Sequence, residues 1–229
     1  MYTVELHTHS AHSYDGRDPV EDLLERAAAA DLDAIAVTDH DTVAGGREVA
    51  DLAPEYGLLG IPGVEVSSEA GHVLALGVDR DLSAGLPFAE TVQRIRDAGG
   101  IAVVPHPFQK ARSGVLANIS RAELADHADA IEVYNSRLLT GRSNRKAARF
   151  ARREGIPMTA GSDAHIGEMV GRATTTVAAT DRSVEAILSA IEAGETTVEG
   201  TRTPWRISFR QAAGGVKRRV AARVGSLLE

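Results

Sequence analysis

The chain has 229 residues, enough for one large α/β domain, and 43% of them are hydrophobic while only 4% are aromatic. It contains no cysteine, which excludes disulfides and thiolate metal sites, and its net charge of −7 argues against general nucleic-acid binding by the main body. No stretch reaches the roughly 20 apolar residues of a membrane span, and no apolar leader precedes a cleavage site, so we expect a soluble, cytoplasmic protein.

Short β-branched runs alternate with helical patterns along the chain. Strands are expected at residues 2–6, 33–39, within 57–68, and at 72–78, 101–106, 130–135, 156–165 and 172–179. Helices are expected at 18–30, 42–57, 88–100, 121–128, 141–155 and 183–194, the first with Asp18 as its N-cap. This alternation predicts βα units with a mostly parallel sheet, and about seven such units favour a barrel.

Polar side chains follow most of the predicted strands, at the point where each strand ends. Parallel strands open their carboxyl ends onto one face of a barrel, so these side chains are expected to converge there. Asp39 is interpreted as a partner that fixes a histidine tautomer or as a helix cap. The other members of the set are His7, His9, His40, Glu65, His106, Asn135, Asp163 and His165.

The residue types of this set indicate metal binding. Imidazole and carboxylate suit Zn²⁺, Mn²⁺ and Fe²⁺, and a His-x-His pair on an extended segment directs both rings to the same side. A single tetrahedral site needs about four ligands, and more are present here. We therefore expect two or three divalent ions (Mn²⁺, Zn²⁺ or Fe²⁺) with a bridging carboxylate.

The stretches HTHSAHSYDG, VTDHDT, GVEVS, PHP, IEVYN and GSDAH resemble the successive motifs of the PHP (polymerase and histidinol phosphatase) family. They occur in order from about residue 3 to residue 178. The resemblance, which is nearest to the small metal-dependent phosphoesterase subgroup, implies a distorted (β/α)₇ TIM-like barrel with a trinuclear metal centre. We expect a barrel domain at residues 1–200 and a basic extension at 201–229.

The resemblance also implies which residues are ligands. His7, His9 and Asp163 resemble ligands of a first metal, and Glu65 resembles a bridge to a second. His106 resembles a ligand of the second metal, and Asp15, His40 and His165 resemble the third site. Some relatives have a histidine in place of Asp15, and a carboxylate there favours harder ions such as Mn²⁺ or Mg²⁺.

Four further residues are candidates for substrate or metal contacts. His72 is predicted to bind metal or phosphate, the alternative being an ordinary histidine at the start of a strand. Asn135 is predicted to be a weak ligand or a substrate contact. Arg137 is our first choice for binding phosphate, with Arg112 second, because guanidinium groups match phosphate oxygens. The arginines of the helix at 141–155 are interpreted as its solvated face.

These features predict a metal-dependent phosphoric ester hydrolase. We expect hydrolysis of a phosphomonoester, such as a nucleotide or a small phosphorylated metabolite, by a metal-bridging hydroxide. Glu65, Asp163 and His165 are the expected catalytic residues, with Asp163 or His165 handling the proton of the leaving alcohol. The alternatives are a nuclease or proofreading-type phosphodiesterase acting on nucleic acid, and a binding module with a vestigial metal site.

The basic extension has its own pattern. Residues 204–210 alternate apolar and basic side chains as a half-buried strand does, and residues 214–229 have valines at helical spacing. We expect the terminal helix to pack on the acidic barrel, or alternatively to contact anionic lipid or RNA.

Overall fold

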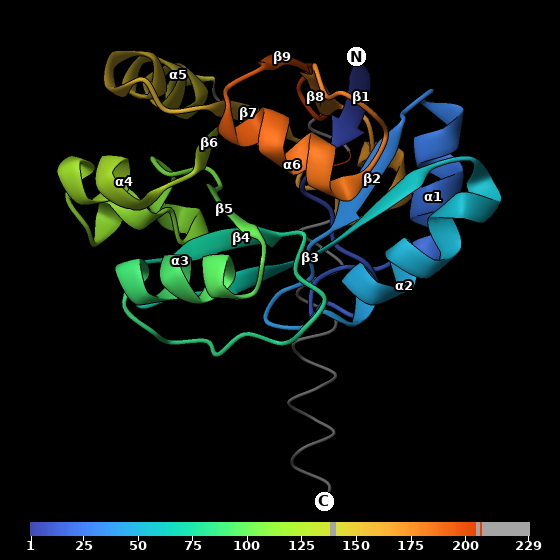
Figure 1. The fold of residues 1–229 in the computed structure, drawn as a ribbon, viewed down its shortest axis with the longest axis horizontal. Coiled ribbons are helices and arrows are strands. Elements are labelled where there is room, and N and C mark those ends of the chain that lie inside the picture. The colour runs from blue at the N-terminus through green and yellow to red at the C-terminus, as the bar shows by residue number, and fades with distance from the viewer. Residues whose placement is uncertain (138–140, 205–206, 208–229) are drawn as a thin grey trace, which may run out of the picture.

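The computed structural model describes residues 1–137, 141–204 and 207 (Figure 1). The predictions for the strand at 204–210 and the helix at 214–229 therefore lie outside the described residues, except at positions 204 and 207. The strands are β1 (Tyr2–Glu5), β2 (Ala34–Val37), β3 (Leu59–Ser67), β4 (His72–Leu76), β5 (Ile101–Val104), β6 (Ala130–Asn135), β7 (Met158–Gly161), β8 (Ala173–Val177) and β9 (Thr196–Gly200).

Six α-helices and four 3₁₀ turns connect the strands in the described part of the chain. The helices are α1 (Val20–Ala29), α2 (Ala44–Leu52), α3 (Phe88–Asp97), α4 (Arg121–His127), α5 (Arg142–Glu154) and α6 (Val184–Glu192). The 3₁₀ turns are η1 (Ala53–Tyr56), η2 (Lys110–Arg112), η3 (Val115–Ala117) and η4 (Gly167–Met169). The predicted N-cap of the first helix is wrong, because Pro19 occupies that position and the Asp18 carboxylate instead accepts a hydrogen bond from the Gly167 amide, 2.7 Å away.

All strands belong to one sheet in the order β7-β6-β5-β4-β3-β2-β1-β8-β9. Neighbours are parallel from β1 to β3 and from β5 to β7, whereas β4 is antiparallel to both of its neighbours. The sheet nearly closes where the Thr175 hydroxyl of β8 contacts the backbone nitrogen and oxygen of Ala160 in β7, at 2.9 and 3.2 Å. This arrangement confirms a single-domain α/β fold with a distorted barrel.

The barrel departs from the ideal form in two places. β3 and β4 form a hairpin with Ser67 opposite His72, so no helix separates them. β8 runs antiparallel to β1, and β9, which the sequence did not predict, is antiparallel to β8. β9 gave no sequence signal because it is a short, largely exposed edge strand with few apolar side chains.

The core is aliphatic, as the low aromatic content requires. One cluster fills the space between β1, β2, β3, β4, β5 and α6, where Ile187, Leu188 and Ile191 of the helix pack on strand residues such as Leu76 and Val103. Beyond β9 the chain contacts the barrel through Thr203, which is buried and donates its amide to the Ser136 oxygen, 2.9 Å away. This packing leaves the opposite end of the strands to polar residues.

Candidate metal centre

The predicted ligands lie at one end of the barrel. His7 and His9 follow β1, His40 follows β2, and His106 follows β5. Glu65 is in the second half of β3, Asp163 and His165 follow β7, and Asp15 lies in the loop before α1. All are buried except the half-buried Asp15 and His40. The parallel strands thus bring together residues that are far apart in the sequence.

Four groups of three or four side chains offer ligand atoms that all lie within 4.8 Å of one another. The groups share members, so each ion placed in one would lie next to another. This overlap is typical of a centre with more than one metal. The groups are His9–Asp15–His40–His165, His7–Glu65–His106, His7–His9–Asp163 and His40–Glu65–His72.

Glu65 is the centre of this arrangement. Its Oε2 atom lies 3.3 Å from both His9 Nε2 and His40 Nδ1. Its Oε1 atom lies 2.9 Å from His72 Nδ1 and 3.5 Å from His106 Nε2. One carboxylate therefore faces imidazoles on both of its oxygens, which is the geometry that a bridging ligand needs.

The residues fit divalent cations on two independent grounds. Several buried ring nitrogens have no hydrogen-bond partner among the described residues: His7 Nε2, both nitrogens of His9, His40 Nδ1 and His106 Nδ1. Buried polar atoms without partners are costly, so a ligand is expected to satisfy them. In addition, Glu65 and Asp163 are buried carboxylates within 4.0 Å of these rings, and cations would offset their charge.

His72 lies at the same end because β4 runs in the reverse direction, which places its first residue beside the carboxyl ends of the other strands. It was predicted to bind metal or phosphate, and the structure groups it with His40 and Glu65. Asn135 is buried, and its amide donates to Glu132 Oε2 and Asp163 Oδ2, at 2.9 and 3.3 Å. It contacts the ligand residues and does not line the cavity beside them.

Glu132 is a residue whose part in the site the sequence analysis missed. Its Oε1 lies 2.9 Å from His7 Nδ1, and its Oε2 accepts from the His106 amide at 3.0 Å. A carboxylate that is hydrogen-bonded to Nδ1 fixes the orientation of the ring, so that Nε2 faces the groups of candidate metal ligands. The sequence signal was a glutamate between the apolar residues at the start of a buried strand, AIEVYN.

The partner of Asp39 is neither the histidine nor the helix N-terminus that the sequence analysis predicted. Its carboxylate accepts from the Ser10 amide at 2.6 Å and from the Ser10 hydroxyl at 2.7 Å. Burial raises the pKa of Asp39, and the two Ser10 hydrogen bonds oppose that shift. Both interpretations from sequence were therefore wrong: Asp39 holds the loop that follows His9.

The charges within the cluster are strongly coupled. Burial disfavours the charged form of Asp163, but Arg137, His7 and Arg112 outweigh it and hold the pKa well below its usual range. Burial lowers the pKa of His9, and the neighbouring His165 and His40 lower it further. At neutral pH Asp163 is therefore ionised and His9 neutral, the forms that ligate metals, whereas burial of His7 is outweighed by Glu132 and Glu65, which raise its pKa.

Two of the ligand candidates have strained backbones. His106 has a φ of 34° and Asp163 a φ of 53°, both in the left-handed region. Such conformations cost energy and cluster at functional sites, where surrounding contacts enforce them. Both side chains belong to the groups of candidate ligands.

A cavity of about 380 Å³ opens beside the cluster. Two arginines reach it from different segments: Arg112 Nη1 lies 2.8 Å from Asp163 Oδ2, and Arg137 Nη1 lies 3.0 Å from Asp163 Oδ1. Tyr14, which the sequence analysis did not single out, also lines the cavity, is 65% exposed, and stacks on His40 with ring centroids 4.8 Å apart. Two cationic side chains and one aromatic ring therefore line the cavity.

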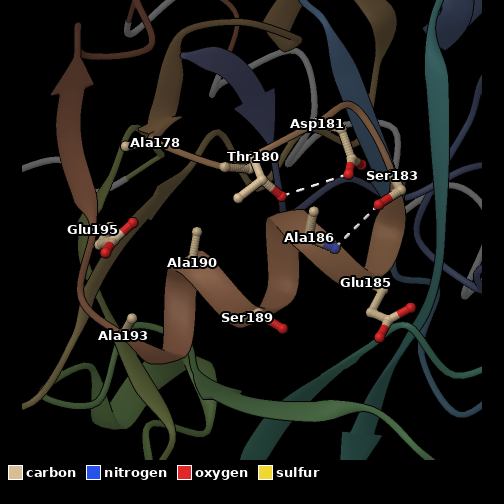
Figure 2. A pocket seen from close by; sticks show the side chains of 11 residues that line it. Ala178, Thr180, Asp181, Ser183, Glu185, Ala186, Ser189, Ala190, Ala193 and Glu195 are labelled. Carbon is tan, nitrogen blue, oxygen red and sulfur yellow. Dashed lines mark hydrogen bonds between the residues drawn. The ribbon is translucent and has the colours of Figure 1, made fainter.

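Another hollow, of about 490 Å³, lies along α6 (Figure 2). Small side chains such as Ala186, Ser189 and Ala190 line it, together with three carboxylates, and no candidate ligand does. Most of the candidate ligands line the cavity at the histidine cluster instead.

Comparison with known proteins identifies the family. A family model described as PHP-associated matches residues 141–196. An uncharacterized protein of Methanocaldococcus jannaschii is 30% identical over 142 residues, which are 58% of this chain and 81% of that protein. The chain belongs to the PHP family. Similar proteins include one named a diphosphodiesterase, one named a bisphosphate phosphatase and one that contains a predicted metal-dependent phosphoesterase, which is consistent with the hydrolase predicted from sequence.

Other similarities are more local. The phosphoribosyl 1,2-cyclic phosphate 1,2-diphosphodiesterase of Eggerthella lenta is 40% identical over 86 residues, 35% of this chain and 32% of that enzyme. The 3′,5′-nucleoside bisphosphate phosphatase of Chromobacterium violaceum is 39% identical over 93 residues, 38% of this chain and 32% of that enzyme. The chain thus matches about a third of each of these enzymes.

A solved structure shares the fold. It is a two-domain protein of Bacteroides vulgatus that contains a predicted PHP-like metal-dependent phosphoesterase, and it superposes with a TM-score of 0.73 at 20% identity, over 87% of this chain and 65% of that one. Among the described residues, no helix is long and apolar enough to cross a membrane.

Proposed function

We propose that this PHP protein is a metal-dependent phosphomonoesterase that acts on a small phosphorylated molecule. The observation that supports it is the convergence of overlapping ligand groups and two arginines on one cavity of about 380 Å³. Imidazoles and carboxylates suit Mn²⁺, Zn²⁺ or Fe²⁺, and arginines match phosphate oxygens. The names of the two enzymes that are locally similar, a phosphodiesterase and a phosphatase, agree with phosphate-ester chemistry.

We assign two or three divalent ions to these overlapping groups, with Glu65 as the shared carboxylate and His7, His9, Asp15, His40, His106, Asp163 and His165 as further ligands. When bound, divalent ions would lower the pKa of a water molecule and neutralise charge on the transferred phosphoryl group. Glu132 orients His7, and Asn135 orients Glu132 and Asp163. His72 is assigned to the same centre because its Nδ1 atom faces Glu65.

Arg137 and Arg112 are assigned to the phosphate. Both guanidinium groups line the cavity, and both now contact the ionised Asp163. A phosphate group entering beside Asp163 would find two planar donors preformed, which favours bidentate contacts. Neutralising the phosphate oxygens in this way stabilises the charge that develops during transfer.

His165 is the better candidate than Asp163 for the proton of the leaving alcohol. The lowered pKa of Asp163 keeps that carboxyl ionised, so it has no proton to donate. Both ring nitrogens of His165 face acceptors: Nδ1 is 3.0 Å from the Asp163 carbonyl oxygen, and Nε2 is 2.8 Å from Asp15 Oδ2. Unlike Asp163, the His165 ring can carry a transferable proton on one nitrogen while the other binds metal or accepts from Arg137 Nη1, which lies 2.9 Å from Nε2.

The test compares p-nitrophenyl phosphate with bis-p-nitrophenyl phosphate, using protein loaded with Mn²⁺, Zn²⁺ or Fe²⁺. We expect the monoester to be the better substrate and His9→Ala to lose activity and bound metal together. His127→Ala is the matched control, because His127 lies on α4 against Phe88 and not in the cavity. Full activity of the His9→Ala variant, or preference for the diester, would refute the assignment.

A further inference from the structure

A groove of about 540 Å³ lies between α4 and α5, separate from the metal cavity. Figure 1 shows these two helices on the same flank of the molecule, opposite α1 and α2. Four of its six lining residues are cationic and none is acidic: Arg121 from α4, and Lys146, Arg149 and Arg153 from α5, with Phe108 and Phe150. A groove of this composition attracts anions.

The cations of the groove are ordered and mostly without acidic partners. The Arg121 guanidinium lies over the Phe108 ring at 5.5 Å, and that of Arg153 lies over the Phe150 ring at 5.7 Å. Such cation–π contacts hold the guanidinium planes in place. Among the described residues, Arg153 pairs with its neighbour Glu154, and no carboxylate forms an ion pair with Arg121, Lys146 or Arg149.

The positive charge continues around α5. The helix has six basic residues and one acidic residue in thirteen positions, in a chain whose net charge is −7. A second hollow on its other side, of about 530 Å³, is lined by Arg145, Arg149 and Arg152 of the helix, and by Arg202 and Tyr134. A merely solvated helix face would not explain why so many basic side chains of α5 lie on one flank of the molecule.

The groove and the metal cavity share one connecting segment. Phe108 lines the groove, whereas Ala111, Arg112 and Ser113, a few residues later, line the cavity. The Ser143 hydroxyl at the start of α5 donates to Gln109 Oε1 at 3.3 Å, which ties the helix to this segment. A polyanionic chain bound along α5 would therefore extend toward the metal cavity.

We infer that the α4–α5 groove binds the phosphodiester backbone of a single-stranded nucleic acid. Several spaced cations match a ligand with regularly spaced phosphates, and guanidinium planes provide surfaces on which bases stack. Single-stranded binding of this kind needs no base-specific contacts. The inference goes beyond the proposed function because it concerns binding at a second site. Its test measures binding and needs no turnover.

The test is the binding of the full chain, loaded with metal, to a fluorescent, nuclease-resistant 2′-O-methyl RNA of about twelve nucleotides. The groove variant is Lys146→Gln/Arg149→Gln/Arg153→Gln. The control variant, Arg80→Gln/Arg94→Gln/Arg182→Gln, removes the same charge from exposed positions elsewhere. Both retain the basic residues after position 201, so that segment contributes equally to each.

We expect the groove variant to bind the RNA at least about ten-fold more weakly at moderate salt, and the control less than about two-fold more weakly. The slope of log affinity against log salt should fall by about 2 in the groove variant, since each lost phosphate contact removes about 0.7. Equal losses in the two variants, or no binding by the unaltered chain, would overturn the inference. Equally tight binding of poly-glutamate or of anionic lipid vesicles would also overturn it.

Discussion

Replacement of Glu132 by glutamine tests whether the tautomer of His7 is set by its neighbour. The glutamate accepts from His7 Nδ1 through one oxygen, and from the His106 amide and the Asn135 amide through the other, at 2.9, 3.0 and 2.9 Å. Glutamine has the same shape but only one acceptor oxygen. The NH₂ group must therefore face either the His7 donor alone, or the His106 and Asn135 donors together.

The less costly orientation decides the outcome. If the NH₂ group faces the His106 and Asn135 donors, two buried donors lose their acceptor, at about 1–3 kcal/mol each. If it faces His7, one contact is inverted: Nδ1 becomes the acceptor and the proton moves to Nε2. His7 Nε2 is the atom that faces Glu65, 3.5 Å away, and a protonated nitrogen cannot bind metal. Loss of such an orienting partner costs about 10–100-fold in metal affinity, or about 1.4–2.8 kcal/mol.

The assay is calorimetric titration of Mn²⁺ and Zn²⁺ into metal-free Glu132→Gln, with circular dichroism to show that the barrel is folded. Glu90→Gln is the matched control, because Glu90 forms only an exposed pair with Arg94 on α3. We expect weaker metal binding in the first variant and unchanged binding in the second. Metal affinity of Glu132→Gln within about two-fold of the unaltered protein would refute this account of the tautomer.

Four other outcomes are expected. Chelation should lower the thermal midpoint, and restoring metal at about 100 times its Kd should regain about 2.7 kcal/mol; equal midpoints would contradict bound structural ions. Gly161→Ala should destabilise the fold by about 1–3 kcal/mol in urea, because a Cβ there would lie 2.5 Å from the His7 Cβ. Asp39→Ala should cost about 1–3 kcal/mol in the same assay by leaving the buried Ser10 amide unpaired; an unchanged midpoint would count against it. Tyr14→Ala should raise KM for p-nitrophenyl phosphate more than for glycerol phosphate, since about 0.5–1.5 kcal/mol of ring contact is lost.

The residue types gathered at this end of the barrel were predictable because candidate metal ligands belong to a small set. Without cysteine, only imidazole and carboxylate remained, and His7, His9, His40, Glu65, His106, Asp163 and His165 each follow or end a strand-like run. In a sheet that is mainly parallel, position at a strand end is enough to predict convergence. The alternation of strands and helices likewise predicted the α/β barrel.

Other parts of the site depended on contacts that no local pattern encodes. The sequence did not show that β4 reverses direction, and that reversal places His72 beside Glu65. It did not show that Glu132 reaches His7, 125 positions away. Strand direction and side-chain pairing across the barrel are set by the packing of the whole chain, so the sequence by itself determined which ligand atoms are present, and only the tertiary structure decided how they face one another.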